Sequence, residues 1–269
     1  MTLHTQHRKA ASVVPATPLA VEQHEGVCWL RLNRPHRRNA LEPQLIARLN
    51  EEISHAIDDQ DIAVVVIAGN GRSFCAGADL RYLLGHAHAG GDPVPFLTEV
   101  SRCFDRIEQC PKPVIAAVHG HVVAGGLELA LACDIVIAEA GTLIGDGHVR
   151  NGLLPGGGAS TRLPRKAGEP LARWLMLSGT LMPAEKLATH GLVHDIAPPG
   201  RLSQRAAHLA GQLIHPPARQ AQAGVKGLLH QWNDEHDSQQ RELKAFARHW
   251  RNSDIRPTLE RFVYGRRGE

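Results

Sequence analysis

The chain has 269 residues, of which 43% are hydrophobic and 21% charged, and its formal net charge is +3. This length and apolar fraction suffice for one large core, and the small net charge, without a long lysine and arginine block, argues against nucleic acid as a partner. No run approaches the roughly 18 consecutive apolar residues that a membrane span needs, so we expect no membrane partner.

The ends of the chain differ in composition from its centre. Residues 1–17 carry no acidic residue and lack the apolar centre of a signal peptide, which favours a disordered arm over a transit peptide. We expect a core with the active site over residues 18–200 and a helical oligomerisation region over 201–269. The five cysteines form no Cys-x-x-Cys pair and lie in apolar or helical patterns, which predicts reduced thiols and a cytoplasmic location.

Strands and helices are predicted to alternate through the first half of the chain. Val27–Leu32 is typical of a strand, and Pro43–Ile57 has apolar residues at helical period after an opening proline. Ile62–Ala68 is a continuous apolar run, typical of a strand buried on both faces. The pattern continues with a helix over Phe96–Cys110, a strand over Pro113–Val118, a helix over Gly125–Cys133 and a strand over Ile135–Ala138. This alternation predicts an α/β core with parallel pairing.

Residues 85–95 are rich in glycine, histidine and proline and predict a mobile loop. His86 and His88 in this loop have no third ligand nearby, so we expect no metal site.

Helices dominate the predicted C-terminal part. They are expected over Ala184–His190, Leu202–Ile214, Ala218–Trp232, Gln239–Trp250 and Pro257–Val263. The expected strand in this part is Leu192–Ile196. Helices of this kind with exposed apolar faces often pack on another subunit.

Two segments with small residues lead into predicted helices, Ser73–Leu80 and Val122–Glu128. Unpaired backbone N–H groups at such helix starts favour negative charge, and glycine and alanine let a ligand oxygen approach closely. One N–H from each segment would make an oxyanion hole for a thioester enolate. Taken singly, each segment is also consistent with an ordinary glycine turn.

Several motifs in order along the chain resemble those of the crotonase family, the enoyl-CoA hydratases and isomerases. They extend from about residue 20 to residue 265 and comprise Leu32-Asn33-Arg34-Pro35 with Asn39-Ala40-Leu41, Ser73–Leu80, Lys112–Gly120, Gly125–Leu129 leading to Cys133-Asp134-Ile135, Gly152–Gly158, Thr161–Pro164, and Asn252–Pro257 leading to Arg261-Phe262.

The resemblance implies a crotonase fold, in which ββα units form a superhelix followed by helices that build a homotrimer or a dimer of trimers. It implies an acyl-CoA thioester as substrate and no separate cofactor, because coenzyme A is part of the substrate. By match, the oxyanion amides belong to Ala78 and Gly125. The residues implied to bind substrate or coenzyme A are Arg38, Ala40, Ala76, Gly77, Asp79, Leu80, Gly126 and Phe262, and Arg34–Arg38 are implied near the phosphates.

The acid/base positions separate this chain from the hydratase pattern. Hydratases of this family use two glutamates; Glu128 matches the first, whereas His148 stands where the second is expected, with the spacing to the Pro155-Gly156 turn intact. A histidine can give or take a proton near pH 7. If residues 145–148 are extended, Asp146 lies on the same side as His148 and can orient it or act directly.

The sequence therefore predicts an acyl-CoA-processing enzyme, with hydration of a 2-enoyl-CoA as the leading reaction and Glu128, His148 and Asp146 as catalytic residues. Double-bond isomerisation and carbon–carbon bond hydrolysis stay open, as does a protein that binds acyl-CoA without catalysis. For His119 and His121, which flank the site, an ordinary turn role is favoured.

Overall fold

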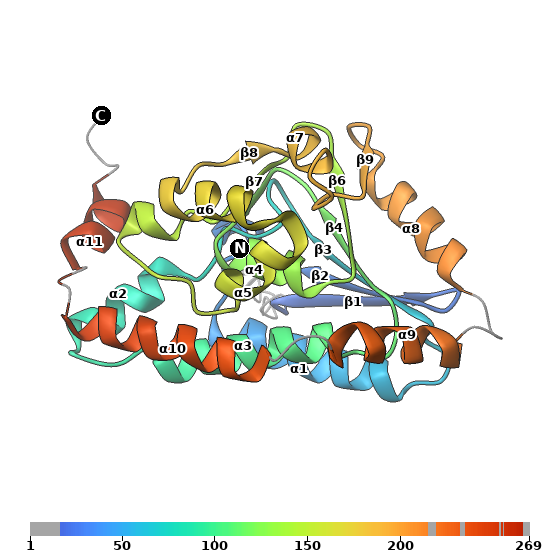
Figure 1. The fold of residues 1–269 in the computed structure, drawn as a ribbon, viewed down its shortest axis with the longest axis horizontal. Helices are drawn as coiled ribbons and strands as arrows, with labels where there is room; N and C mark the ends of the chain where they lie inside the picture. The colour runs from blue at the N-terminus through green and yellow to red at the C-terminus, as the bar shows by residue number, and fades with distance from the viewer. Residues whose placement is uncertain (1–16, 215–218, 232–234, 253, 255, 266–269) are drawn as a thin grey trace, which may run out of the picture.

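The computed structural model describes residues 17–214, 219–231, 235–252, 254 and 256–265, whose strands form two sheets (Figure 1). The larger sheet has the strand order β1 (Leu19–His24), β2 (Val27–Leu32), β3 (Val64–Gly69), β4 (Val114–Val118), β6 (Ile135–Glu139) and β9 (Asp195–Ala197). Strand β1 pairs antiparallel with β2, and the other neighbours are parallel. The predicted parallel α/β core is confirmed.

The smaller sheet brings two parts of the candidate site together. It has the order β5 (His121–Val123), β7 (Leu143–Gly145) and β8 (Met182–Pro183). Strands β5 and β7 are parallel, with Val123 opposite Gly145. The residues that follow these two positions, Ala124 and Asp146, therefore leave the sheet side by side.

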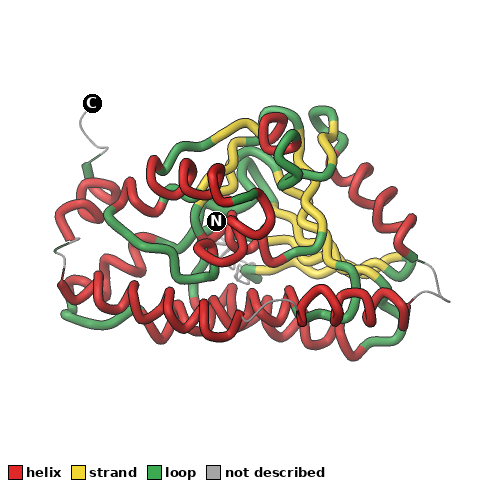
Figure 2. The backbone as a smooth tube through the Cα atoms, viewed as in Figure 1, coloured by secondary structure: helices red, strands yellow, loops and turns green. Residues whose placement is uncertain are grey.

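Helices cover both faces of the larger sheet. Figure 1 and the tube in Figure 2 show α1, α3, α9 and α10 in a layer on one side and α8 against the other. The helices are α1 (Pro43–Asp58), α2 (Leu80–His88), α3 (Val94–Glu108), α4 (Gly125–Ala132), α5 (Ala159–Ala167), α6 (Glu169–Ser178), α7 (Ala184–Ala188), α8 (Leu202–Leu213), α9 (Arg219–Gln231), α10 (Glu235–Asn252) and α11 (Arg256–Tyr264), with 3-10 turns η1 (Pro35–Arg37) and η2 (His148–Asn151).

The side chains of β3 alternate between two apolar clusters. Val65 and Ile67 pack into the larger cluster, with α1, α3 and α4, whereas Val64 and Val66 face a smaller cluster. That smaller cluster is closed by Ala206 and its neighbours on α8. Because helices cover both faces of the sheet, neither face of β3 is exposed to water. The sequence of β3 is therefore a continuous apolar run.

Helix α4 is the most deeply placed helix near the site. Every residue from Gly125 to Ala132 is buried. A helix that is apolar all round belongs inside a core, and the charged member of this one is Glu128. The sequence of α4 therefore carries a carboxylate into the interior.

The predicted mobile loop over residues 85–95 is wrong at both ends, because helix α2 extends to His88 and helix α3 begins at Val94. Helix α2 runs through Gly85 to His88, because Asp79 caps its start by accepting a hydrogen bond from the Arg81 N–H and because Leu83 is buried. The loop proper spans residues 89–93.

Most predicted elements are confirmed with end shifts of a few residues, as expected where helices and strands fray. The C-terminal helices are present, although the predicted helix ends at Ala218 and Trp232 lie outside the described residues, as do residues 1–16 of the predicted arm. The predicted strand Leu192–Ile196 is shifted to β9. Among the described helices, none combines the length and apolarity needed to cross a bilayer.

Candidate active site

Two short strand-like contacts hold the segment that contains Ala78. Ala78 pairs with Leu41 as in a parallel sheet: the Leu41 N–H donates to the Gly77 carbonyl, and the Asp79 N–H donates to the Leu41 carbonyl. Because successive peptide groups in a strand point to opposite sides, the N–H of Ala78 faces away from Leu41. The bonds between Cys75 and β5 hold the same segment from its other side.

Gly125 starts helix α4 after a sharp turn. Ala124 has φ 52° and ψ −118°, a conformation that L-residues rarely adopt, and its N–H donates to the Gly145 carbonyl. As the first residue of the helix, Gly125 has no intrahelical acceptor for its N–H. The turn therefore presents this N–H beyond the end of β5.

The Ala78 and Gly125 amides border the same small space. A Cβ atom placed on Gly125 would lie 3.5 Å from the Ala78 nitrogen, and one placed on Gly77 would lie 3.3 Å from the Gly125 nitrogen. The glycines leave this space open, and two N–H groups bordering one space can bind an oxyanion.

The Glu128 carboxylate is held by the turn before α5. Its Oε1 accepts hydrogen bonds from the N–H groups of Gly157, at 2.8 Å, and Ala159, at 3.1 Å. The residue is 2% exposed. A Cβ on Gly157 would lie 2.7 Å from Glu128 Oε2, so a glycine is needed for this approach. Sequence reasoning missed these two donors, although the Pro155-Gly156-Gly157-Gly158 run before a helix is their signal.

His148 contacts both Glu128 and Asp146, although residues 145–148 are not extended, which was the condition under which the sequence placed Asp146 beside His148. Strand β7 ends at Gly145, Gly147 adopts φ 67°, and His148 begins the turn η2. The glycine folds the chain back, so that Asp146 Oδ1 still lies 3.0 Å from His148 Nδ1. The other ring nitrogen, Nε2, lies 3.9 Å from Glu128 Oε2. Asp146 and His148 are both buried.

The surroundings of the pair shift both pKa values upward. Burial raises the pKa of Glu128 to about 7, although the positive charge of His148 opposes this. Burial alone would lower the pKa of His148, but the hydrogen bond to Asp146 and the charge of Glu128 outweigh it and raise that pKa to about 9. Between these two values the pair is a carboxylate beside an imidazolium, which can accept one proton and donate another.

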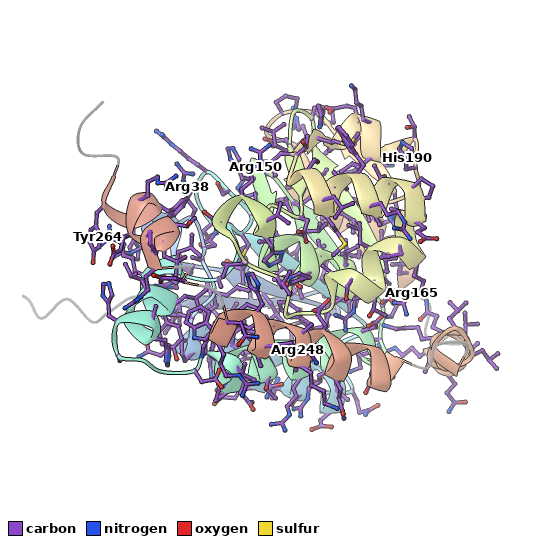
Figure 3. All side chains as sticks on the ribbon, turned by 60° about the vertical axis from the view of Figure 1, so that its left-hand side comes forward. Arg38, Arg150, Arg165, His190, Arg248 and Tyr264 are labelled. Atoms are coloured by element: carbon purple, nitrogen blue, oxygen red, sulfur yellow. The ribbon has the colours of Figure 1, made fainter. Side chains whose placement is uncertain are left out.

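The residues implied to bind coenzyme A line a cavity of about 280 Å³ next to Ala78. In Figure 3, Arg38 and Tyr264 of α11 lie toward the same side of the molecule. The lining includes six of the eight residues that the resemblance implies, namely Arg38, Ala40, Ala76, Asp79, Leu80 and Phe262.

Gly77 and Gly126 do not line this cavity; their lack of a side chain allows the local backbone conformation and packing. Gly77 has φ +92° at the turn beside Gly125, and a Cβ on Gly126 would lie 2.3 Å from the Cys75 carbonyl oxygen. Arg34 does not line the cavity either. It contacts Glu42, Asp79 and the Ala40 carbonyl, and so stabilises residues that do line it.

Of the other histidines singled out in the sequence, His121 begins strand β5, and the side chains of the remaining three have partners of their own. His119 Nε2 lies 2.9 Å from the Gly71 carbonyl oxygen, His86 packs edge-on against Tyr82, and His88 Nε2 lies 2.7 Å from a Glu260 carboxylate oxygen. Within the described residues there is no group of three or more His, Cys, Asp or Glu side chains placed to hold a metal ion.

Comparison with known protein families shows which family has this sequence. The sequence profile of the family described as enoyl-CoA hydratase/isomerase matches residues 22–267. The chain belongs to the enoyl-CoA hydratase/isomerase family. The resemblance to the crotonase family is thereby confirmed.

Relatives in this family cover most of the chain. The 2,3-dehydroadipyl-CoA hydratase of Escherichia coli (strain K12) is 36% identical over 211 residues, which are 78% of this chain and 81% of that protein. The crotonyl-CoA hydratase of Syntrophomonas wolfei is 32% identical over 197 residues, 73% of this chain and 75% of that protein.

Solved structures of family members share the fold. An enoyl-CoA hydratase/isomerase from Xanthobacter autotrophicus Py2 superposes with a TM-score of 0.82 at 26% identity, over 92% of this chain and 94% of that one. An enoyl-CoA hydratase from Mycobacterium tuberculosis H37Rv gives a TM-score of 0.74 at 35% identity, over 88% and 100%. The predicted crotonase fold is confirmed.

Proposed function

We propose that this protein adds water across the double bond of a 2-enoyl-CoA thioester. The observation that carries the proposal is the buried Glu128–His148 pair beside the space bordered by the Ala78 and Gly125 amides. The names of the relatives, which include hydratases of dehydroadipyl-CoA and crotonyl-CoA, support the same reaction.

The thioester oxygen binds the two backbone N–H groups. When water attacks the β-carbon, negative charge moves onto this oxygen and the thioester becomes an enolate. Donors fixed in advance stabilise that charge without rearranging, and losing one such donor typically costs about 3–4 kcal/mol of barrier. The Ala78–Leu41 pairing and the start of α4 provide this rigidity.

Glu128 and His148 move the protons. The Glu128 carboxylate takes a proton from the attacking water, whose oxygen bonds to the β-carbon, and the His148 imidazolium donates its Nε2 proton to the α-carbon. The resting charges return when the proton on Glu128 passes to His148. Their 3.9 Å separation is too long for a direct hydrogen bond, and a water oxygen that contacts both groups fits it.

Asp146 holds the imidazole for this role. Its contact with Nδ1 fixes the ring orientation and leaves Nε2 facing Glu128. The proposed chemistry draws on no separate cofactor, because coenzyme A is part of the substrate.

The test is hydration of 2-enoyl-CoA thioesters from crotonyl-CoA to longer chains, followed by loss of the conjugated absorbance. We expect turnover by the wild type and a loss of at least about 100-fold in Glu128→Gln, because a neutral amide cannot take the proton. Glu51→Gln, an exposed glutamate on α1, is the matched control and keeps wild-type turnover.

Other outcomes separate the alternatives. Turnover that moves the double bond, or that cleaves a 1,3-dicarbonyl thioester, without hydration of any enoyl-CoA overturns the proposed reaction. Tight binding of acyl-CoA with no turnover, unchanged in His148→Ala, would establish a binding protein instead.

A further inference from the structure

A second buried carboxylate, Glu242 of helix α10, contacts the same turn that holds Glu128. It accepts hydrogen bonds from the N–H groups of Gly158, at 2.6 Å, and Ser160, at 2.8 Å, and from the Ser160 hydroxyl. Glu242 is 7% exposed. It comes from the C-terminal region that the sequence predicts for oligomerisation.

Successive N–H groups of the turn donate alternately to the two carboxylates. The amides of Gly157 and Ala159 donate to Glu128, and those of Gly158 and Ser160 donate to Glu242. The N–H groups of Gly157 and Gly158 come just before α5, and those of Ala159 and Ser160, in its first turn, have no acceptor within the helix. The arrangement satisfies all of them and places both anions at the positive end of the helix dipole.

The peptide group between Gly157 and Gly158 makes a hydrogen bond at each of its two ends. The carbonyl of Gly157 accepts from Arg162 Nη1 at 2.7 Å, and the N–H of the same peptide group, on Gly158, donates to Glu242. Because a peptide group is planar, these two bonds together fix its rotation. Arg162 is fully buried and is itself held by Glu108.

We propose that Glu242 is a positioning residue, which holds this turn from α10 so that its other two amides fix the carboxylate of Glu128. The orientation of Glu128 toward His148 is then set by a helix that lies far away in the sequence. The charge of Glu242 also acts on the pair, since it favours the imidazolium form of His148. The inference rests on the proposed hydration for its kinetic readout, but its spectroscopic readout does not.

The experiment compares wild type, Glu242→Gln and Glu242→Asp, with Glu51→Gln as the matched control. A glutamine offers one acceptor and an NH₂ group where two amides need acceptors, so the turn must shift. We expect kcat for crotonyl-CoA hydration to fall roughly 10- to 100-fold, as a displacement of about 1 Å in a catalytic group does. KM should change little, because the cavity next to Ala78 does not include Glu242.

The second readout is the titration of the His148 ring by NMR in the same proteins. In Glu242→Gln the pKa of His148 should fall below the wild-type value, because a nearby negative charge is removed. Glu242→Asp keeps the charge but shortens the reach, so it should lower kcat with a smaller shift of the titration. A role confined to stability would lower the melting temperature, leave kcat unchanged in both variants, and leave the His148 titration unchanged in Glu242→Asp, which keeps the charge.

The outcomes are distinct. If a folded Glu242→Gln or Glu242→Asp keeps wild-type kcat and the wild-type His148 titration, the positioning role is overturned. If the wild type hydrates no enoyl-CoA, the proposed function fails, and the His148 titration in Glu242→Asp, which keeps the negative charge, still decides the positioning role.

Discussion

At the scale of single residues, the proposed chemistry depends on two groups, Glu128 and His148, whose pKa values are both raised but by different causes. Glu128 is an acid made weaker by burial, and His148 is a base made stronger by Asp146 and Glu128. The environment therefore separates an acceptor from a donor around neutral pH. In the proposed mechanism, a histidine in this position performs what a second glutamate could do only in its protonated form.

The first prediction is a bell-shaped pH profile of kcat/KM for crotonyl-CoA hydration, with limbs near pH 7 and pH 9. Below about pH 7 Glu128 becomes protonated and cannot take a proton, and above about pH 9 His148 becomes neutral and cannot donate one. In His148→Asn we expect a residual rate roughly 10²–10⁴-fold lower. Its alkaline limb should be absent, and its acid limb should lie at higher pH because the cation that lowers the pKa of Glu128 is gone.

His190→Asn, at an exposed position after α7, is the control and should keep both limbs. An alkaline limb that persists unchanged in His148→Asn would contradict the donor role of this histidine.

The second prediction concerns backbone strain at Ala124. Its φ of 52° with ψ of −118° is a conformation that glycine adopts readily. Relief of this strain should exceed the entropy that a glycine adds to the unfolded chain, so Ala124→Gly should be more stable by about 1 kcal/mol in urea denaturation. Ala130→Gly, inside helix α4, which follows Ala124, should lose stability by at least about 1 kcal/mol. Equal destabilisation by both changes would show that Ala124 is not strained.

At the scale of elements, the starts of α4 and α5 meet around one carboxylate, and the third prediction tests this meeting. In Gly157→Ala the new Cβ would lie 2.7 Å from Glu128 Oε2 and 3.0 Å from Phe104, so Glu128 must move. We expect kcat to fall roughly 10- to 100-fold, as for other misplaced catalytic groups. Steady-state kinetics on crotonyl-CoA measures this.

Gly211→Ala on α8 is the matched control, because nothing lies within 4 Å of its Cβ position. It should keep full activity and gain about 0.5–1 kcal/mol of stability, since alanine favours a helix interior. Wild-type kcat in Gly157→Ala would contradict the close approach of the turn to Glu128.

The elements show what local sequence can and cannot predict. Strand β3 and helix α4 were predictable because burial on all sides leaves continuous apolar runs. The placement of the Ala78 and Gly125 amides at one space, and of His148 beside Glu128, follows from motif spacing. The hydrogen bonds from the turn to Glu242 were not predictable. Glu242 lies 82 residues from Ser160, and a single glutamate leaves no periodic pattern in the sequence. Asp146 lies beside His148, but a glycine turn brings it there and not the extended conformation considered from the sequence.

At the scale of the whole molecule, helices α6 and α9 leave large apolar side chains on the surface. Leu177 is 77% exposed, and Trp174, Val225, Leu228 and Leu229 are each more than half exposed. Side chains of this kind are often covered by another subunit. We therefore keep the homotrimer, or a dimer of trimers, as a prediction.

The fourth prediction is a solution mass of three or six times the 29.2 kDa of one chain, measured by analytical ultracentrifugation. Leu177→Arg should weaken the assembly, because it places a charge where an apolar contact is expected, whereas Arg173→Lys on the same helix should not. A monomer at micromolar concentration would contradict this prediction.

The most direct measurement of the central claim is product analysis after incubation of crotonyl-CoA in heavy-oxygen water. The account predicts a 3-hydroxyacyl-CoA that carries one heavy oxygen on the β-carbon, formed by the wild type and suppressed at least about 100-fold in Glu128→Gln. Recovery of unchanged substrate from the wild type, or of heavy oxygen only in a free acid released by thioester cleavage, would contradict it.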